Sequence, residues 1–197
     1  MNAFVILGII LWVYLLWVFE RGKLRFFKFL LGSVGLFIFM MIIVQPIVTE
    51  PLAKLVAACS GIVGDVTGLF KSYYDYGLLF INNKSGAISL YIDYECSGVI
   101  EMMAFSSLLC FFPVYKWSEK IIINFISLFC ILISNVIRIV VICTTVYFCG
   151  VKSFYLAHTI LGRIVFYGLT IILYYYVFTK AQIIRQKVGR FNYERNV

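Results

Sequence analysis

Three residues of the sequence, Cys96, Arg138 and His158, are of the types that acyl transfer needs. A cysteine is a weak nucleophile until it loses its proton, and a nearby histidine or positive charge favours the thiolate. His158 is the single histidine of the chain. An arginine keeps its proton and can hold an oxyanion through several directed N–H groups. The three residues could therefore act as nucleophile, proton carrier and charge stabiliser, provided that the fold brings them together.

The elements that would have to position these residues are membrane helices. Of the 197 residues, 63% are hydrophobic and three are prolines, and the mean hydropathy is +0.99, which excludes an ordinary soluble domain. Runs of about 20 apolar residues can cross a hydrocarbon core of about 30 Å as helices. We count five such runs, at residues 3–19, 29–48, 98–115, 121–149 and 154–178. The composition predicts an all-α integral membrane helical bundle with about five transmembrane helices.

Basic residues indicate the orientation of this bundle. The net charge is +8, and most Lys and Arg residues flank the apolar runs, in segments 21–28, 116–120 and 179–197. These segments share one side if the spans alternate, and the positive-inside rule makes that side cytoplasmic. We therefore expect a plasma-membrane protein with its N-terminus outside and its basic tail in the cytoplasm, attracted to anionic lipid. The same distribution disfavours nucleic acid as a partner.

Residues 1–197 form one multi-pass domain in this interpretation, and its most polar part is the outer segment before Cys96. Residues 52–70 mix small, apolar and charged residues, which predicts one or two interfacial helices; they are too polar and glycine-rich to be assigned as a span. Two β-favouring runs flank Asn82-Asn83-Lys84-Ser85-Gly86, a sequence typical of a hairpin turn. The hairpin would lead the chain to Cys96 at the mouth of the third span.

The expected topology places the three candidate residues at one depth. At 1.5 Å per residue, Arg138 lies about 26 Å along the outward-running fourth span, close to the outer face. His158 lies about 6 Å below the outer boundary in the fifth span, and Cys96 opens the third span from the same side. Asn135, one turn before Arg138, could orient it. Glycine at position 98 would let another part of the backbone approach the thiol.

Each ionisable or nucleophilic residue also has a purely structural explanation. A cysteine at a helix mouth can fill space, a histidine near the interface can be an amphipathic side chain, and an arginine can snorkel to the head groups. Glu101 and Arg163, which also lie within spans, are expected to form a mutual or interior ion pair. The six cysteines show no C-x-x-C spacing and no histidine cluster accompanies them. Neither a disulfide framework, a metal site nor a cofactor is therefore predicted.

Three motifs strengthen the catalytic interpretation. In order and spacing, ECSGVIEM, NVIRIVVI and AHTILGRIVFYG resemble the motifs of the exosortase/archaeosortase family: Cys-Ser-Gly at a helix mouth, an Asn-x-x-Arg helix, and a His followed by an aromatic-Gly helix. The resemblance covers roughly residues 50–178, which would be the catalytic region. The short length and basic tail look most like the Gram-positive branch called exosortase family protein XrtG. By this resemblance, Cys96 would form an acyl-thioester, while Arg138 and His158 would share proton donation and transition-state stabilisation.

The resemblance further implies a multi-pass cysteine transpeptidase. Its substrates would be secreted proteins that end in a short motif, a hydrophobic helix and a basic cluster, cleaved at the outer face and transferred to a lipid or cell-envelope acceptor. The sequence is shorter, with fewer spans, than the longer bacterial exosortases. Two alternatives stay open: an intramembrane cysteine peptidase whose thioester is resolved by water, and a non-enzymatic small transporter or membrane assembly protein with a polar path through its ionisable residues.

Overall fold

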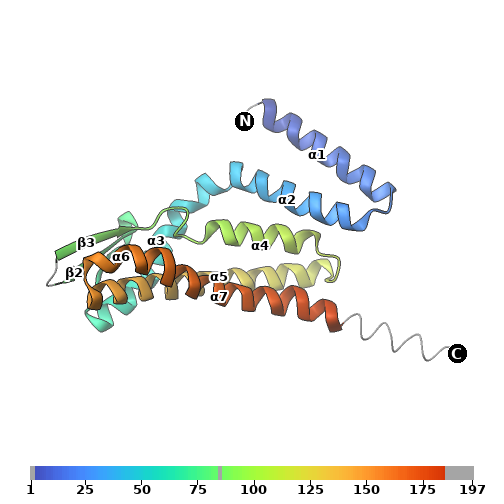
Figure 1. Ribbon diagram of the computed structural model, residues 1–197. Helices are drawn as coiled ribbons and strands as arrows, with labels where there is room; N and C mark the ends of the chain where they lie inside the picture. Colours follow the sequence, from blue (N-terminus) through green and yellow to red (C-terminus); the bar gives the residue numbers. More distant parts are fainter. Residues whose placement is uncertain (1–2, 84–85, 185–197) are drawn as a thin grey trace.

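Long apolar helices make up most of the fold (Figure 1). The computed structural model describes residues 3–83 and 86–184. The α-helices are α1 (Ala3–Arg21), α2 (Arg25–Ile43), α3 (Gln45–Thr67), α4 (Val99–Phe111), α5 (Trp117–Cys149), α6 (Phe154–Leu156) and α7 (Gly162–Tyr174). Two π-helical segments, Ala157–Leu161 and Tyr175–Lys180, precede and follow α7. The chain from Val151 to Ile184 therefore runs as one nearly continuous helical rod.

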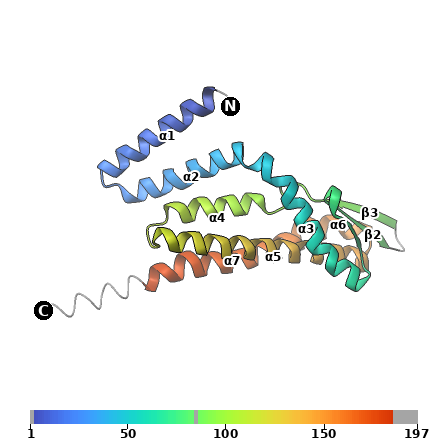
Figure 2. The ribbon, with the colours of Figure 1, turned by 180° about the vertical axis from the view of Figure 1, so that it is seen from behind.

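Helices α2, α4, α5 and α7 lie side by side, and α1 packs on the far side of α2 (Figures 1 and 2). By length and composition, four helical segments among the described residues could cross a membrane: Arg25–Ile43, Gln45–Thr67, Trp117–Cys149 and Val151–Ile184. The predicted fold class, an all-α membrane bundle with a small β-hairpin, is confirmed.

The third apolar run, expected to span over residues 98–115, forms the shorter helix α4. It begins after Gly98, whose φ is +80°, and stops at Phe112, whose backbone is extended. Phe112 precedes Pro113, and the residue before a proline is disfavoured in the α-helical region. The 13 residues of α4 reach only about 20 Å, short of a core of about 30 Å. This helix therefore cannot span a bilayer alone, and it packs between α2 and α5.

Residues 52–70, expected at the interface, belong mainly to the single helix α3. Only Val44 separates it from α2; it has a proline in its first turn and is long and apolar enough for a span. It leaves the line of the bundle and packs against β1 and α5 at the end opposite the α1–α2 turn (Figure 2). The glycines that argued against a span here permit that contact, because a Cβ at Gly61 would lie 2.5 Å from Ser72 Cβ. We call this end of the molecule the sheet end, and the end with the α1–α2 and α4–α5 turns the turn end.

The hairpin expected before Cys96 is present. The antiparallel sheet consists of β1 (Lys71–Tyr73), β2 (Leu78–Asn83) and β3 (Gly86–Tyr91), in the order β1-β2-β3. Strand β1 was not expected. Two residues of the predicted turn, 84–85, lie outside the described residues, as does most of the predicted basic tail, residues 185–197.

The buried core has two parts. At the sheet end, α3, the sheet and the last turns of α5 enclose an apolar cluster that includes Leu79, Ile142 and Cys96. Nearer the turn end, Phe105 and Phe166 belong to a second cluster between α4, α5 and α7. Helix α5 contributes to both because its 33 residues measure about 50 Å, well beyond a core of about 30 Å. The candidate site lies where these clusters meet, because Cys96 belongs to the first cluster and Arg138 contacts Phe166 of the second.

Candidate functional site

Cys96 lies in the tight turn that connects β3 to α4, and Asp93 builds that turn. The Asp93 Oδ1 atom accepts hydrogen bonds from the backbone N–H groups of Glu95 and Cys96, at 3.1 and 3.0 Å, and the Asp93 carbonyl accepts one from Ser97 N at 2.8 Å. An aspartate that bonds to the backbone two and three residues ahead closes a stable turn. Cys96 is only 3% exposed. Its position is thus set by local hydrogen bonds rather than by packing alone.

Asn135 of α5 ties the Cys96 turn to the helix that carries Arg138. The Asn135 side chain donates from Nδ2 to the Cys96 carbonyl at 2.7 Å, in a fully buried position. Gly98, beside this contact, has a φ of +80°, a conformation that is costly for other residues, whereas a Cβ there would only be in ordinary van der Waals contact with Asn135 Nδ2, at 3.4 Å. The neighbour of Gly98 is the side chain of Asn135 on α5, not another part of the backbone as expected.

Replacing Gly98 by alanine is expected to lower the free energy of unfolding by about 1–2 kcal/mol, the usual cost of a left-handed conformation for a residue with a Cβ. Thermal unfolding of the purified protein in detergent measures this effect. The matched control is Gly168→Ala in α7, where a Cβ meets nothing within 4 Å and alanine should be neutral or slightly stabilising. Equal melting temperatures for the two variants would contradict the prediction.

Arg138 brings its guanidinium to the Cys96 sulfur. Its Nη2 lies 3.8 Å from Cys96 Sγ, and its Nη1 donates to the Glu95 carbonyl at 3.4 Å. The guanidinium also lies over the ring of Phe166, 5.6 Å from its centroid, a favourable cation–π contact. Arg138 is 5% exposed, and its Nε is buried without a hydrogen-bond partner. The site therefore holds a buried positive charge with unused donor capacity directly beside the thiol.

His158 reaches the same sulfur from the opposite helix. Its Nε2 lies 3.8 Å from Cys96 Sγ, and its ring stacks on Phe154 at a centroid distance of 5.6 Å and an interplanar angle of 17°. The residue sits in the π-helical segment Ala157–Leu161. Such segments redirect side chains and occur often at functional sites. The π-turn and the Phe154 ring together aim the imidazole at the thiol.

The structure thus brings Cys96, Arg138 and His158 together, and two further expectations can be compared with it. Asn135 lies beside Arg138 but bonds to the Cys96 carbonyl rather than to the guanidinium. The ion pair expected for Glu101 and Arg163 is not formed: among the described residues neither takes part in a salt bridge. Arg163 is exposed on α7, whereas one carboxylate oxygen of Glu101 is buried in α4 without a hydrogen-bond partner.

Three residues that support the site were not predicted from the sequence. Asp93 had a local signal, because an aspartate three residues before a fixed position is typical of a side-chain-closed turn. Phe154 stands four residues before His158, the spacing of neighbours on one helix face. Phe166 had no such signal, because its contact with Arg138 joins two helices that are distant in sequence.

Burial controls the protonation of the thiol. It raises the pKa of Cys96 to about 12, while the positive charge of Arg138 acts in the opposite direction and the nearby carboxylates of Asp93 and Glu95 add to the rise. The thiol is therefore protonated at neutral pH, and it needs a base to become a nucleophile. The His158 imidazole is the group placed to accept that proton.

Alkylation of Cys96 by iodoacetamide should be very slow at pH 7 and should accelerate about tenfold per pH unit toward alkaline pH. With a pKa of about 12, only roughly one thiol in 10⁵ is ionised at pH 7. Mass spectrometry of the peptide that contains Cys96 gives the rate, and the Cys96→Ala variant gives the background from the other cysteines. Labelling at pH 7 as fast as that of a small free thiol would instead reveal a preformed thiolate.

Within residues 3–83 and 86–184, no three His, Cys, Asp or Glu side chains are grouped closely enough to hold a metal ion. What the site offers is a thiol, an imidazole and a guanidinium at the junction of a sheet and a helical bundle. These are groups for covalent and acid–base chemistry on a carbonyl compound.

Fold and site together define a multi-pass helical membrane protein with a buried Cys, Arg and His cluster at its sheet end. A model of the transmembrane exosortase family matches residues 1–175, which is most of the 197-residue chain. The chain therefore belongs to the transmembrane exosortase family. No curated protein and no solved structure gave a significant match.

Proposed function

We propose that this protein is a cysteine transpeptidase that cleaves a C-terminal sorting signal of secreted proteins through an acyl-thioester. The observation that carries the proposal is the pair of 3.8 Å contacts that Cys96 Sγ makes with His158 Nε2 and Arg138 Nη2. A nucleophile, a proton acceptor and a fixed positive charge meet at one sulfur atom. Such a group is required for acyl transfer, and membership of the exosortase family supports this use of it.

The first half of the reaction forms the thioester. His158 Nε2 takes the thiol proton as Cys96 Sγ attacks the scissile carbonyl carbon, and the new S–C bond leaves an oxyanion that Arg138 stabilises through N–H groups and charge. The tetrahedral intermediate collapses when the C–N bond breaks, and the imidazolium returns the proton to the leaving amine. For this cycle the neutral imidazole carries its hydrogen on Nδ1, which is buried without a partner.

The second half releases the product. An amine of a lipid or cell-envelope acceptor attacks the thioester, His158 takes a proton from that amine, and the Cys96 thiolate leaves and is reprotonated. The buried position of the thiol favours a positioned acceptor over bulk water. Water in place of the amine gives a free carboxylate, and the protein would then be a cysteine peptidase.

The proposal also covers the orientation of the protein in the membrane and its branch within the family. We place the sheet end outside the plasma membrane and the turn end in the cytoplasm, because most basic residues flank the turn end. Substrates would carry a C-terminal hydrophobic helix with a basic end, which lies in the bilayer beside the bundle and presents its motif to Cys96. Within the family, the basic tail supports the Gram-positive XrtG branch.

A polar conduction path, the basis of the transporter alternative, fits the interior less well. Below the site, Phe105, Leu109, Ile131 and Phe166 are all 0–1% exposed and fill the space between α4, α5 and α7. A transport path needs polar groups through the full membrane depth.

The proposal is tested by co-expressing the protein with a secreted protein that ends in a hydrophobic helix and a basic cluster. Hydroxylamine should release the substrate from a covalent adduct on Cys96, and mass spectrometry should find an amine-linked group on the new C-terminus. A free carboxylate there would identify a peptidase. An uncleaved substrate and no adduct, with several candidate substrates, would refute both enzymatic versions.

A further inference from the structure

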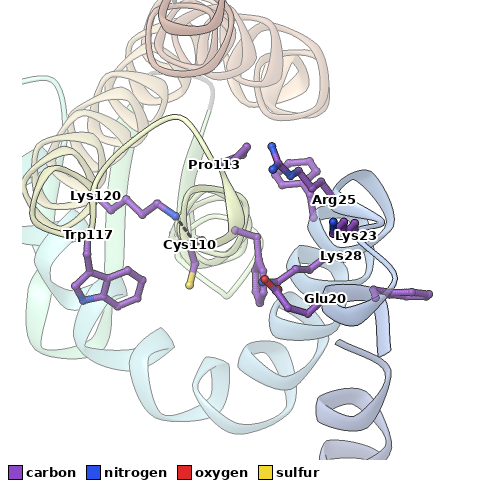
Figure 3. Close-up of a pocket in the computed structure, with 11 residues that line it drawn as sticks. Glu20, Lys23, Arg25, Lys28, Cys110, Pro113, Trp117 and Lys120 are labelled. Atoms are coloured by element: carbon purple, nitrogen blue, oxygen red, sulfur yellow. Dashed lines mark hydrogen bonds and ion pairs between the residues drawn. The ribbon is translucent and has the colours of Figure 1, made fainter. Parts of the chain in front are cut away.

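A cavity with basic and apolar walls lies at the turn end, at the opposite end of the bundle from Cys96. Its volume is about 670 Å³, within the usual range for small-ligand sites. The α1–α2 turn forms one wall and the α4–α5 turn the other (Figure 3). The proposed peptide chemistry makes no use of this cavity, which we call the turn-end pocket.

Positive charge dominates the turn-end pocket. Lys23, Arg25, Lys28 and Lys120 line it, against a single carboxylate, Glu20, which is paired with Lys28. Lys120 donates a hydrogen bond to the carbonyl of residue 110 and lies near the ring of residue 117. Lys23 and Arg25 make no side-chain hydrogen bond or ion pair with any other described residue. Two cations of the pocket are therefore free to bind an anion.

The backbone at this pocket also favours an anion. Helix α2 begins with Leu24 as its N-cap, which provides no side-chain hydrogen bond, and its first turn contains no acidic residue. The Arg25 N–H already donates to the Lys23 carbonyl, but the other N–H groups of this first turn and the helix dipole attract negative charge. Lys23, just before this turn, has a φ of +55°, a strained value for a non-glycine residue. This strained residue belongs to the α1–α2 turn, which places Lys23 and Arg25 at the pocket.

The rest of the lining is apolar. Aromatic and other hydrophobic side chains complete the walls: Phe19, Phe29, Phe111, Pro113 and Trp117. Trp117 starts α5, and tryptophan at the end of a membrane helix is typical of the head-group level. A ligand that suits this pocket has a negative group for the cations and hydrocarbon for the aromatic walls. A soluble phosphate would leave those apolar walls uncovered.

We propose that the turn-end pocket binds the phosphodiester head group of an anionic phospholipid. The phosphate contacts Lys23 and Arg25 at the start of α2, and the acyl chains pass along the aromatic residues toward the bilayer. Basic pockets between membrane helices at the bilayer surface are suited to such head groups. A bound lipid links the α1–α2 turn to the α4–α5 turn and so holds α1, which packs at the edge of the bundle, in place.

The test measures lipid retention by the full-length protein. The protein is reconstituted in nanodiscs of phosphatidylcholine with a minor share of phosphatidylglycerol, and native mass spectrometry records which lipids stay bound. Phosphatidylglycerol should be retained selectively. The double variant Lys23→Gln, Arg25→Gln should bind it about 30-fold more weakly, since each basic residue at a membrane surface contributes roughly 1 kcal/mol. If the double variant does not fold, the single variant Arg25→Gln replaces it and should bind phosphatidylglycerol about fivefold more weakly.

The control separates a site from general attraction to basic loops. Lys116→Gln, Lys180→Gln removes the same charge at the turn end from residues that do not line the pocket, and it should change retention less than about twofold. Equal losses in the two double variants would overturn the proposal. Displacement of the lipid by millimolar inorganic phosphate would also overturn it and identify a soluble phosphate site. Because no substrate is involved, this result is independent of the proposed peptide chemistry.

Discussion

Replacing Cys96 by alanine should abolish cleavage of a co-expressed substrate, with a loss of at least about 10³-fold in rate. The thiol is the only group in the cluster that can form a thioester, and the arginine beside it cannot act as a nucleophile. Immunoblotting for the shortened substrate and mass spectrometry for the thioester both measure the effect. The variant should remain folded, because the hydrogen bonds that hold this turn do not involve the sulfur.

The matched control is Cys143→Ala. Cys143 is a second buried cysteine of the same apolar cluster, fully enclosed on α5, and it makes no contact with Arg138 or His158 among those described. Removing it tests the effect of a small cavity alone, which should leave the cleavage rate within a few-fold of the parent protein. Unchanged cleavage in Cys96→Ala would exclude the acyl-thioester mechanism, whatever the control shows.

Replacing Arg138 by glutamine should reduce the rate by roughly 10²–10³-fold, the usual cost of losing an oxyanion-stabilising group. Glutamine keeps a hydrogen-bonding amide but removes the charge that lies 3.8 Å from the thiol. Since Arg138 lowers the pKa of Cys96, its loss should also slow alkylation of Cys96 at a given alkaline pH. Single-turnover cleavage and the pH dependence of labelling measure the two effects separately.

Arg163→Gln is the control for this change. Arg163 is an exposed arginine of α7 without an ion pair among the described residues, so it tests the effect of removing one positive charge from the same membrane segment. Its labelling should equal that of the parent protein, and its rate should stay within a few-fold, because an exposed charge acts on the site only weakly through solvent. If Arg138→Gln were no slower than Arg163→Gln, the guanidinium would not stabilise the transition state.

Features that depend on short stretches of chain could be predicted from the sequence. The hairpin before Cys96 follows from turn residues between two β-favouring runs, and these determine pairing locally. The helix carrying Arg138 follows from a long apolar run that has no alternative to internal hydrogen bonding in a membrane. The length of the helix expected over residues 98–115 was overestimated, because hydropathy depends only on how apolar the residues are. Pro113 disfavours the helical conformation at Phe112 and so ends the helix there. Segment 52–70 was judged by its glycines, which prove to be contact points with the sheet.

The sequence by itself determined the class of the protein, an integral membrane helical bundle. Hydrophobicity is a property of each residue, and a run of about 20 apolar residues is stable as a helix across the bilayer core. It also identified Cys96, Arg138 and His158 by residue type and motif order. Only the tertiary structure decided which ionisable residues meet. Arg138 and Arg163 are chemically identical, yet one faces the thiol and the other solvent or lipid, because the rotation of each helix is set by packing against distant neighbours.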